Sequence, residues 1–234
     1  MEPSEVRNGV PLAAADALAP ARRRMVEEQL RARGIRDRRV LEAMGEIPRH
    51  AFVDPGYIAR AYGDHALPSG EGQTISQPYI VARMLELAEL EPAHRVLEVG
   101  TGTGYQTALL ARLAERVYSV ERVPSLLRAA DQRLRSLGIG NVALRHGDGT
   151  LGWQEFAPYA RVLVAAAAPR VPQALRAQLG ERGVLVIPVG SEELQHLEVW
   201  RRMPQDRWER RRHGECRFVP LRGRDAWPDA PTTE

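Results

Sequence analysis

Three acidic residues stand where nucleotide-binding side chains stand in many α/β proteins. Glu98, Glu121 and Asp148 each come at the end of a short run rich in valine and leucine, or directly after it. Because the carboxyl ends of parallel strands meet at one edge of a sheet, where open α/β sheets bind ligands, we expect the three carboxylates to project from that edge. The pattern predicts a nucleotide site with an acidic wall.

A glycine-rich turn, Gly100-Thr101-Gly102-Thr-Gly104, follows the first of these acids. Alternate glycines let the backbone approach a ligand closely, and a helix beginning at Tyr105 would offer free amides to it. The dinucleotide motif GxGxxG requires glycine where this chain has Tyr105, which argues against a hydride-transferring enzyme. A carboxylate repels pyrophosphate and attracts ammonium and sulfonium groups, so the sequence favours S-adenosylmethionine as the cofactor.

Each acid is expected to bind a different part of this cofactor. Glu98 would bind the amine, and Glu121 would accept hydrogen bonds from both ribose hydroxyls. Asp148 would accept a hydrogen bond from the adenine amino group. Any one of them alone could equally be a helix cap or a solvated charge, so the prediction depends on all three occurring together.

Composition limits the possible classes of protein. The 234 residues can bury one substantial core, and no apolar run is long enough to cross a membrane. The N-terminus lacks the pattern of a secretory signal, so we expect a cytoplasmic protein. The single cysteine, Cys216, excludes an internal disulfide, and no His, Cys or acidic spacing indicates a metal site. The basic residues are all arginines, and we expect their two runs, 22–24 and 210–212, to be solvated faces rather than a nucleic-acid surface.

Apolar runs and helical periods alternate along the middle of the chain, which predicts a doubly wound, mostly parallel α/β sheet. Near the C-terminus, the runs 197–200 and 216–219 alternate apolar and polar residues, which predicts an antiparallel edge. Two helices, 21–33 and 38–44, are expected before a long loop over 49–77. Such a loop is typical of a lid or a binding surface.

These elements predict a single domain, residues 21–234, behind a flexible extension of residues 1–20. We divide the domain into N-terminal helices with a substrate loop (21–78), a cofactor-binding core (79–190) and an antiparallel C-terminal edge (191–225).

The chain resembles the protein-L-isoaspartate O-methyltransferase family over most of its length. The resemblance is most specific in the stretch GQTISQP at 72–78, which few proteins share beyond this family. The other matching stretches are 97–107, 120–122, 146–149, 166–169 with 171–172, 187–190 and 217–221. The resemblance implies the Rossmann-like fold of S-adenosylmethionine-dependent methyltransferases with N-terminal helices.

The resemblance also implies a reaction and a set of site residues. The reaction is methyl transfer to the free α-carboxylate of L-isoaspartyl residues in damaged proteins and peptides, which starts their repair through a succinimide. Ser76 is implied as the catalytic residue. The implied substrate contacts are Thr74, Ile75, Gln77, Arg217, Val219 and Pro220, and the implied cofactor contacts, beyond the acids and glycines above, are Gln73, Thr74, Thr101, Arg122 and Gly149.

This chemistry suits the residue types. A carboxylate with a pKa of about 4 is already ionised at neutral pH, so no general base is needed. The protein has to orient the oxygen and exclude water, for which the hydroxyls of Ser76 and Thr74 are suited. By propensity alone, Ser76 could instead cap the helix that follows it.

The chain departs from the family pattern at a few positions. Ala160 replaces a common aspartate, Ala165 replaces a common threonine, and Arg182 replaces a glycine of a Gly-Gly turn. We expect activity at a lowered rate, from a monomer that binds isoaspartyl substrates and neither nucleic acid nor membrane. The alternatives are a nucleic-acid methyltransferase and a cofactor-binding module with weakened catalysis.

Overall fold

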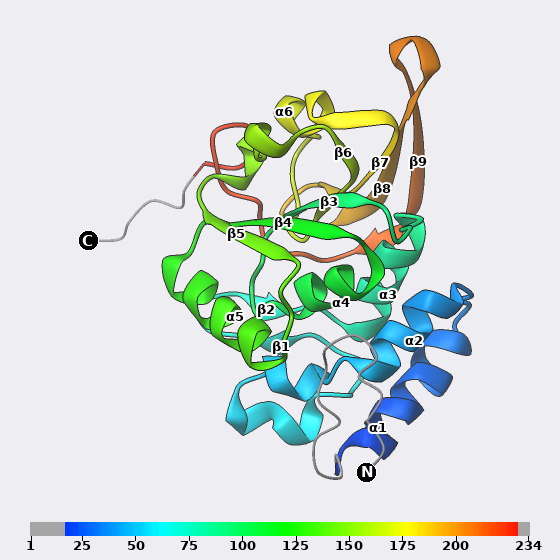
Figure 1. The fold of residues 1–234 in the computed structure, drawn as a ribbon, viewed down its shortest axis with the longest axis vertical. Coiled ribbons are helices and arrows are strands. Elements are labelled where there is room, and N and C mark those ends of the chain that lie inside the picture. Colours follow the sequence, from blue (N-terminus) through cyan, green and yellow to red (C-terminus); the bar gives the residue numbers. More distant parts are fainter. Residues whose placement is uncertain (1–16, 229–234) are drawn as a thin grey trace, which may run out of the picture.

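The computed structural model describes residues 17–228 as an α/β protein built on a seven-stranded sheet (Figure 1). Its strands are β3 (Arg95–Val99), β4 (Arg116–Glu121), β5 (Val142–His146), β6 (Tyr159–Val164), β7 (Leu179–Gly190), β8 (Gln195–Met203) and β9 (Arg207–Cys216). A separate two-stranded sheet consists of β1 (Leu67–Pro68) and β2 (Thr74–Ile75). The helices are α1 (Ala19–Arg24), continued by a π-helical segment (Met25–Arg31), then α2 (Arg38–Glu46), α3 (Pro78–Leu87), α4 (Tyr105–Leu113), α5 (Pro124–Ser136) and α6 (Gln173–Ala177).

The strands follow the order β5-β4-β3-β6-β7-β8-β9. The first five strands in this order, from β5 through β3 to β7, are parallel to one another. Strand β8 is antiparallel to β7, and β9 is antiparallel to β8. The chain winds outward from β3 in one direction and then returns to place β6 on its other side, so the order reverses between β3 and β6. Ligands bind beside such a reversal in open α/β sheets. The predicted parallel sheet with an antiparallel edge is confirmed.

The sheet separates two apolar cores because successive strand residues point to opposite faces. In β3, Val96 belongs to the core beneath the helices, and Leu97 belongs to the core on the other face. The first core joins the sheet to α3 and α4 and to the N-terminal helices, whereas the second lies under α6 and short 3₁₀ turns (Figure 1). The 3₁₀ segments are Arg49–Phe52, Pro55–Arg60, Gly149–Leu151, Gln154–Phe156 and Pro204–Asp206.

The N-terminal helices agree closely with the sequence predictions. Asp37 caps α2 by accepting hydrogen bonds from the amides of Arg39 and Val40. Helix α1 begins at Ala19, so helix already occupies the end of the segment expected to be flexible; residues 1–16 lie outside the described residues.

Two sequence predictions about irregular segments were wrong. The expected loop 49–77 contains two 3₁₀ helices and the paired strands β1 and β2, which are too short to show a hydrophobic period. On the side away from β7, β8 pairs with β9, which ends at Cys216, rather than with the run 216–219. Strand β9 is rich in arginine because it is an exposed edge, so it lacks the apolar alternation that marks a half-buried strand. The β8–β9 hairpin projects beyond the rest of the molecule (Figure 1).

Candidate active site

A cavity of about 340 Å³ lies at the carboxyl ends of β3, β4 and β6, beside the reversal in strand order. Val99 and Val120, at the ends of β3 and β4, and Ala165, directly after β6, form part of its wall. The segment 71–76, which includes β2, and residues 219–222 after β9 supply further parts of the wall. The cavity therefore lies where the sequence predicted a ligand site.

The glycine turn shapes the wall next to β3. Gly100 and Gly104 have φ values of +91° and +90°, in the left-handed region that glycine adopts without strain. A Cβ added at Gly102 would meet no atom within 4 Å, so the turn leaves open space in front of its backbone. Gly104 is the N-cap of α4 and lies behind the cavity rather than in its wall. The turn can therefore receive a ligand at its backbone and at the first turn of α4.

Glu121 joins the turn to the end of β4. One of its carboxylate oxygens accepts a hydrogen bond from the Gly102 amide at 2.8 Å, and the other accepts one from the Val123 amide at 2.9 Å. The side chain is only 5% exposed and lines the cavity. Carboxylate oxygens have further lone pairs, so Glu121 can still accept hydrogen bonds from a diol.

Glu98 lies beneath the cavity and does not line it. Its carboxylate accepts hydrogen bonds from Thr107 Oγ1 at 2.6 Å, Ser119 Oγ at 2.7 Å and Gln106 Nε2 at 3.3 Å. The side chain is fully buried, and this burial raises the pKa of Glu98 to about 7. Three side chains surround the carboxylate and separate it from the cavity, and its direct contact with a cofactor amine stays a prediction.

Glu98 instead supports residues that do line the cavity. Gln106, which it binds, is a wall residue. Ser119, its second partner, lies 2.7 Å from the hydroxyl of Thr101, another wall residue. Glu98 thus fixes two cavity side chains from below.

Asp148 is likewise outside the cavity wall, although its neighbour Gly149 is part of it. One carboxylate oxygen accepts hydrogen bonds from the amide and hydroxyl of Thr150, and the other accepts one from the Arg224 amide at 2.8 Å. The predicted hydrogen bond from adenine to Asp148 stays a prediction, because the carboxylate adjoins the wall residue Gly149 without lining the cavity itself. The carboxylate holds the C-terminal segment against the sheet, a contact that depends on residues 76 positions away in the sequence.

Ser76 lies in the cavity wall, between β2 and α3. The N-cap of α3 is Gln77, which makes no side-chain cap, so Ser76 does not cap this helix. Within residues 17–228 the Ser76 hydroxyl forms no hydrogen bond, and it is available to a ligand. Gln77 points elsewhere and donates to Asp64, so its predicted substrate contact is not supported.

The segment after β9 contributes residues 219–222 to the wall. It is held by hydrogen bonds from the Ala167 amide to the Val219 carbonyl at 2.8 Å and from the Leu221 amide to the Ala167 carbonyl at 2.6 Å. Val219 and Pro220, two of the substrate contacts that the resemblance implies, are therefore cavity residues. Arg217 lies outside the cavity and donates to the Glu193 carbonyl, which does not support its predicted substrate contact.

Most predicted site residues thus meet in one cavity, and several wall residues were not predicted. The predicted residues in the wall are Gln73, Thr74, Ile75, Ser76, Gly100, Thr101, Gly102, Glu121, Arg122, Gly149, Val219 and Pro220. The wall residues that were missed include Glu71, Thr103, Tyr105, Gln106, Ala166, Leu221 and Arg222. Thr103 and Gln106 adjoin the glycine turn, so the expected course of the turn into its helix could have pointed to them.

The turn between β1 and β2 is connected to α5. Ser125 Oγ donates to a Glu71 carboxylate oxygen at 2.8 Å, and Glu71 belongs to the turn between β1 and β2. This contact holds the turn over the same cavity to which Gly72 and Gln73 contribute.

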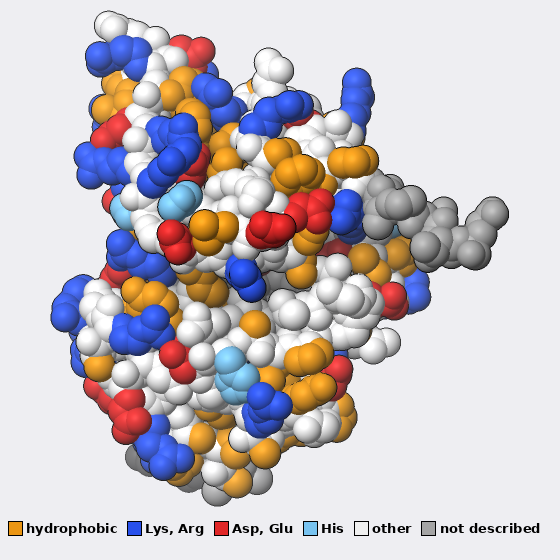
Figure 2. Space-filling view, turned by 180° about the vertical axis from the view of Figure 1, so that it is seen from behind, with side chains coloured by type: hydrophobic (Ala, Val, Ile, Leu, Met, Phe, Trp, Pro, Cys, Tyr) orange, Lys and Arg blue, Asp and Glu red, His pale blue; other side chains and the backbone are white. Residues whose placement is uncertain are grey.

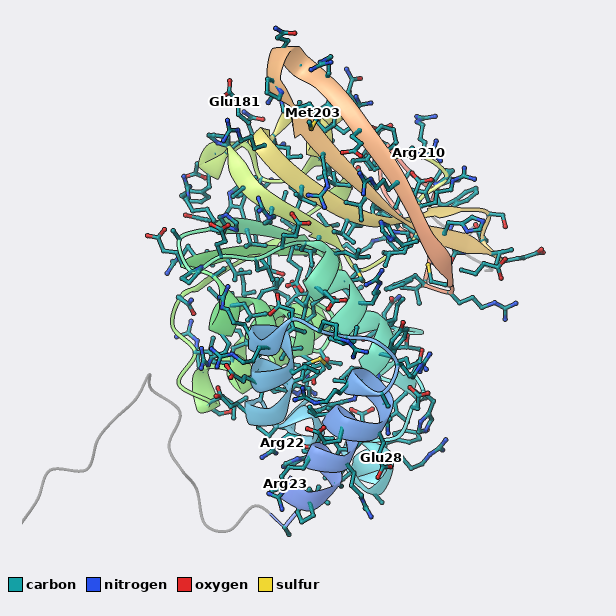
Figure 3. The ribbon with its side chains drawn as sticks, turned by 90° about the vertical axis from the view of Figure 1, so that its right-hand side faces the viewer. Arg22, Arg23, Glu28, Glu181, Met203 and Arg210 are labelled. Carbon is teal, nitrogen blue, oxygen red and sulfur yellow. The ribbon has the colours of Figure 1, made fainter. Side chains whose placement is uncertain are left out.

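The two arginine runs lie at opposite ends of the molecule, as the labels of Arg22, Arg23 and Arg210 show in Figure 3. Arg210 and Arg212 form ion pairs with the buried carboxylate of Glu198. On the face in Figure 2, the projecting end carries acidic and hydrophobic side chains among the basic ones. The runs therefore do not join into one continuous basic surface.

Neither a membrane-spanning helix nor a metal site is found among the described residues. Within residues 17–228, no helix is both long and apolar enough to span a bilayer. Over the same residues, no three His, Cys, Asp or Glu side chains gather as a metal site would require.

Known proteins match both the sequence and the fold. The model of the family described as protein-L-isoaspartate(D-aspartate) O-methyltransferase matches residues 21–226. A protein-L-isoaspartate O-methyltransferase of Koribacter versatilis is 54% identical over 209 residues, which cover 89% of this chain and 94% of that protein. One of Magnetococcus marinus is 52% identical over 198 residues, or 85% of this chain and 87% of that protein.

Solved structures agree with these matches. A protein-L-isoaspartate O-methyltransferase shares 30% identity at a TM-score of 0.78, over 87% of this chain and 67% of that one. A Plasmodium falciparum protein of the same description, in complex with S-adenosyl-L-homocysteine, has a TM-score of 0.75 at 24% identity, over 86% of this chain and 98% of that one. The chain belongs to the protein-L-isoaspartate(D-aspartate) O-methyltransferase family and is an S-adenosylmethionine-dependent methyltransferase.

Proposed function

We propose that the cavity methylates the free α-carboxylate of L-isoaspartyl residues and that Ser76 orients this carboxylate. The observation that carries the proposal is the Ser76 hydroxyl, which lies in the cavity wall without a hydrogen-bond partner in residues 17–228. The glycine turn and Glu121 form the donor side of the cavity. The acceptor side consists of Ser76 with Val219 and Pro220.

The donor side fits an adenosyl cofactor. Glu121 is fixed by two backbone amides, so its remaining lone pairs point in set directions and can receive the ribose hydroxyls. Gly102 leaves room for the ligand against the turn. When bound, S-adenosylmethionine supplies an electrophilic methyl group on a sulfonium.

The acceptor side has only positioning to perform. The substrate carboxylate is ionised at neutral pH, so one oxygen attacks the methyl carbon while the carbon–sulfur electron pair passes to sulfur, and no proton moves. Ser76 would donate a hydrogen bond to the other oxygen and hold the attacking one in line, at about 3 to 3.5 Å from the methyl carbon. The apolar groups of Val219, Pro220 and Leu221 exclude water that would solvate the nucleophile.

The three parts of the single domain serve these two sides. We propose that residues 21–78 contribute Ser76 and the turn between β1 and β2, and that residues 79–190 hold the cofactor. Residues 191–225 would contribute Val219 and Pro220 to the part of the wall that contacts the substrate. The partners are isoaspartyl proteins and peptides, met in the cytoplasm by a monomer. The separation of the arginine runs, and the engagement of Arg210 and Arg212 by Glu198, support a protein substrate over a nucleic acid.

A paired-peptide assay tests the proposal. The protein is incubated with labelled methyl donor and with two peptides that differ only in an isoaspartyl or aspartyl linkage. We expect label in the isoaspartyl peptide alone, and a loss of about 100-fold in kcat for Ser76→Ala with donor affinity retained. Ser136→Ala, which removes an exposed hydroxyl at the end of α5, is the matched control.

Four results would contradict the proposal. Equal labelling of both peptides would remove the substrate assignment, and an unchanged rate for Ser76→Ala would remove the residue from the mechanism. Donor binding without methylation of either peptide would favour the cofactor-binding module instead. Methyl incorporation into RNA would favour the nucleic-acid alternative.

A further inference from the structure

Arg49 is completely buried and has no acidic partner among the described residues. Its Nε donates to the Ala61 carbonyl at 2.7 Å, but Nη1 and Nη2 have no hydrogen-bond partner. Burial lowers the pKa of Arg49 to about 10, and the neighbouring groups that oppose this shift are the tyrosines 62 and 105 rather than a carboxylate. At neutral pH the protein therefore holds a buried, uncompensated cation.

The guanidinium lies directly behind the cavity. Its Cζ is 5.1 Å from the centre of the Tyr105 ring, and Tyr105 is a wall residue. The Tyr105 hydroxyl is also buried without a hydrogen-bond partner. Phe52, at the end of the same 3₁₀ turn as Arg49, lies 3.6 Å from a Cβ built at Gly104. Arg49 is thus packed against the first turn of α4, with the Tyr105 ring between it and the cavity.

A buried cation without a counter-ion is unfavourable, and its electrostatic field is weakly screened. Burial raises the pKa of the Tyr105 hydroxyl, and both Arg49 and Arg22 oppose this rise, so Arg22 adds a second positive charge near the hydroxyl. The free N–H groups at the start of α4 add a partial positive charge in the same region. Three sources of positive potential therefore act on the Tyr105 side of the cavity, and in residues 17–228 no carboxylate forms an ion pair with Arg49.

We propose that Arg49 is a positioning residue for a carboxylate bound on the Tyr105 side of the cavity. The guanidinium acts through the Tyr105 ring: it fixes the ring in the wall and supplies the positive potential that favours the anion. The amino-acid carboxylate of S-adenosylmethionine is the expected occupant, because the glycine turn and α4 belong to the donor side. The carboxylate of the isoaspartyl substrate has the same chemistry, and the test separates the two. The inference rests on the proposed placement of the cofactor.

Binding measurements with two donors isolate the carboxylate. S-adenosylmethionine and its decarboxylated form differ only in that group, and calorimetry without peptide measures their affinities independently of activity. For Arg49→Met we expect about tenfold weaker binding of S-adenosylmethionine, with the affinity for the decarboxylated form changed less than about twofold. Arg49→Lys keeps the charge, so it should keep most of the difference between the two donors. Arg38→Met removes an exposed arginine of α2 outside the cavity wall, so it is the matched control and should bind both donors like the wild type.

A second variant guards against misfolding. If Arg49→Met does not fold, as judged by circular dichroism and thermal melting, Arg49→Gln retains a donor for the Ala61 carbonyl and takes its place. A raised KM for the isoaspartyl peptide, with unchanged donor binding, would assign the carboxylate to the substrate. If the affinities for both donors fall equally, the role of Arg49 is purely structural and the inference is overturned. It is also overturned if the donor affinities and the peptide KM are all unchanged.

Glu121→Gln in the same titration separates this inference from the proposed function. If that variant binds both donors like the wild type, the cofactor placement fails. If Glu121→Gln weakens the binding of both donors while the Arg49 variants bind them like the wild type, only the role proposed for Arg49 is wrong.

Discussion

The carboxylate of Glu121 and the amide of Gly102 are joined by a hydrogen bond of 2.8 Å across the ends of β4 and β3. This bond ties the glycine turn to the neighbouring strand and fixes the carboxylate in the cavity wall. A single side chain therefore both shapes the turn and presents an acceptor to the ligand. Its replacement should affect every ligand that carries the adenosyl ribose.

Glu121→Gln should weaken S-adenosylmethionine binding by about tenfold or more, because a charge-assisted acceptor for the ribose becomes a neutral amide. The neutral side chain also accepts a weaker hydrogen bond from the Gly102 amide. The binding of 5′-methylthioadenosine, which has the ribose but no amino-acid portion, should be weakened by a similar factor in calorimetric titrations. A loss confined to S-adenosylmethionine would show that Glu121 does not bind the ribose.

Glu98→Gln should change how stability depends on pH. The pKa of Glu98 is raised to about 7 in the folded protein, so the folded state holds a proton that the unfolded state releases near its ordinary value of 4.5. Its contribution to stability is therefore greatest at acid pH and decreases as the pH rises from about 4.5 to about 7, by an amount on the order of 3 kcal/mol. Glutamine does not ionise and should flatten this decrease.

Urea denaturation of the wild type and Glu98→Gln at several pH values between 5 and 8 measures the effect. The difference in unfolding free energy should shift in favour of the variant as the pH rises. Thr107→Val, which removes one hydrogen bond to Glu98 without removing the carboxyl, is the control and should retain the slope. Parallel pH profiles for wild type and Glu98→Gln would contradict the assigned titration.

Ala165→Thr should raise kcat about threefold with little change in donor affinity. Ala165 lies in the cavity wall, 3.6 Å from a Cβ built at Gly100, so a hydroxyl at this position adds a polar group beside the donor side. One added hydrogen bond to a bound carboxylate is worth about 1 kcal/mol, the order needed for such a change. Ala165→Val has nearly the same shape without the hydroxyl and should not raise the rate. An equal gain for both variants would attribute the effect to packing.

Some features of the site could be predicted from the sequence because they depend on local backbone chemistry. The glycines of 100–104 adopt positive φ in the turn, and Asp37 caps the helix that follows it. The strands β3 to β7 are recognisable as apolar runs because both faces of a parallel sheet are buried. Their carboxyl ends then meet at one edge, so the position of the cavity followed from the order of elements.

Which of the three acids faces the cavity was decided by tertiary packing. Glu98, Glu121 and Asp148 occupy similar positions in the sequence, yet only Glu121 lines the wall, because Thr107, Ser119 and Gln106 enclose Glu98 and the C-terminal segment engages Asp148.

The same distinction applies to Arg49. The stretch around Arg49 carries no periodic signal, and only the packing of its 3₁₀ turn against Tyr105 places a buried cation behind the ligand. The sequence by itself determined the order of the elements, the turn and the family. The burial and partners of each charged side chain arose only when distant segments packed together, because a charge is compensated by whatever lies next to it in space.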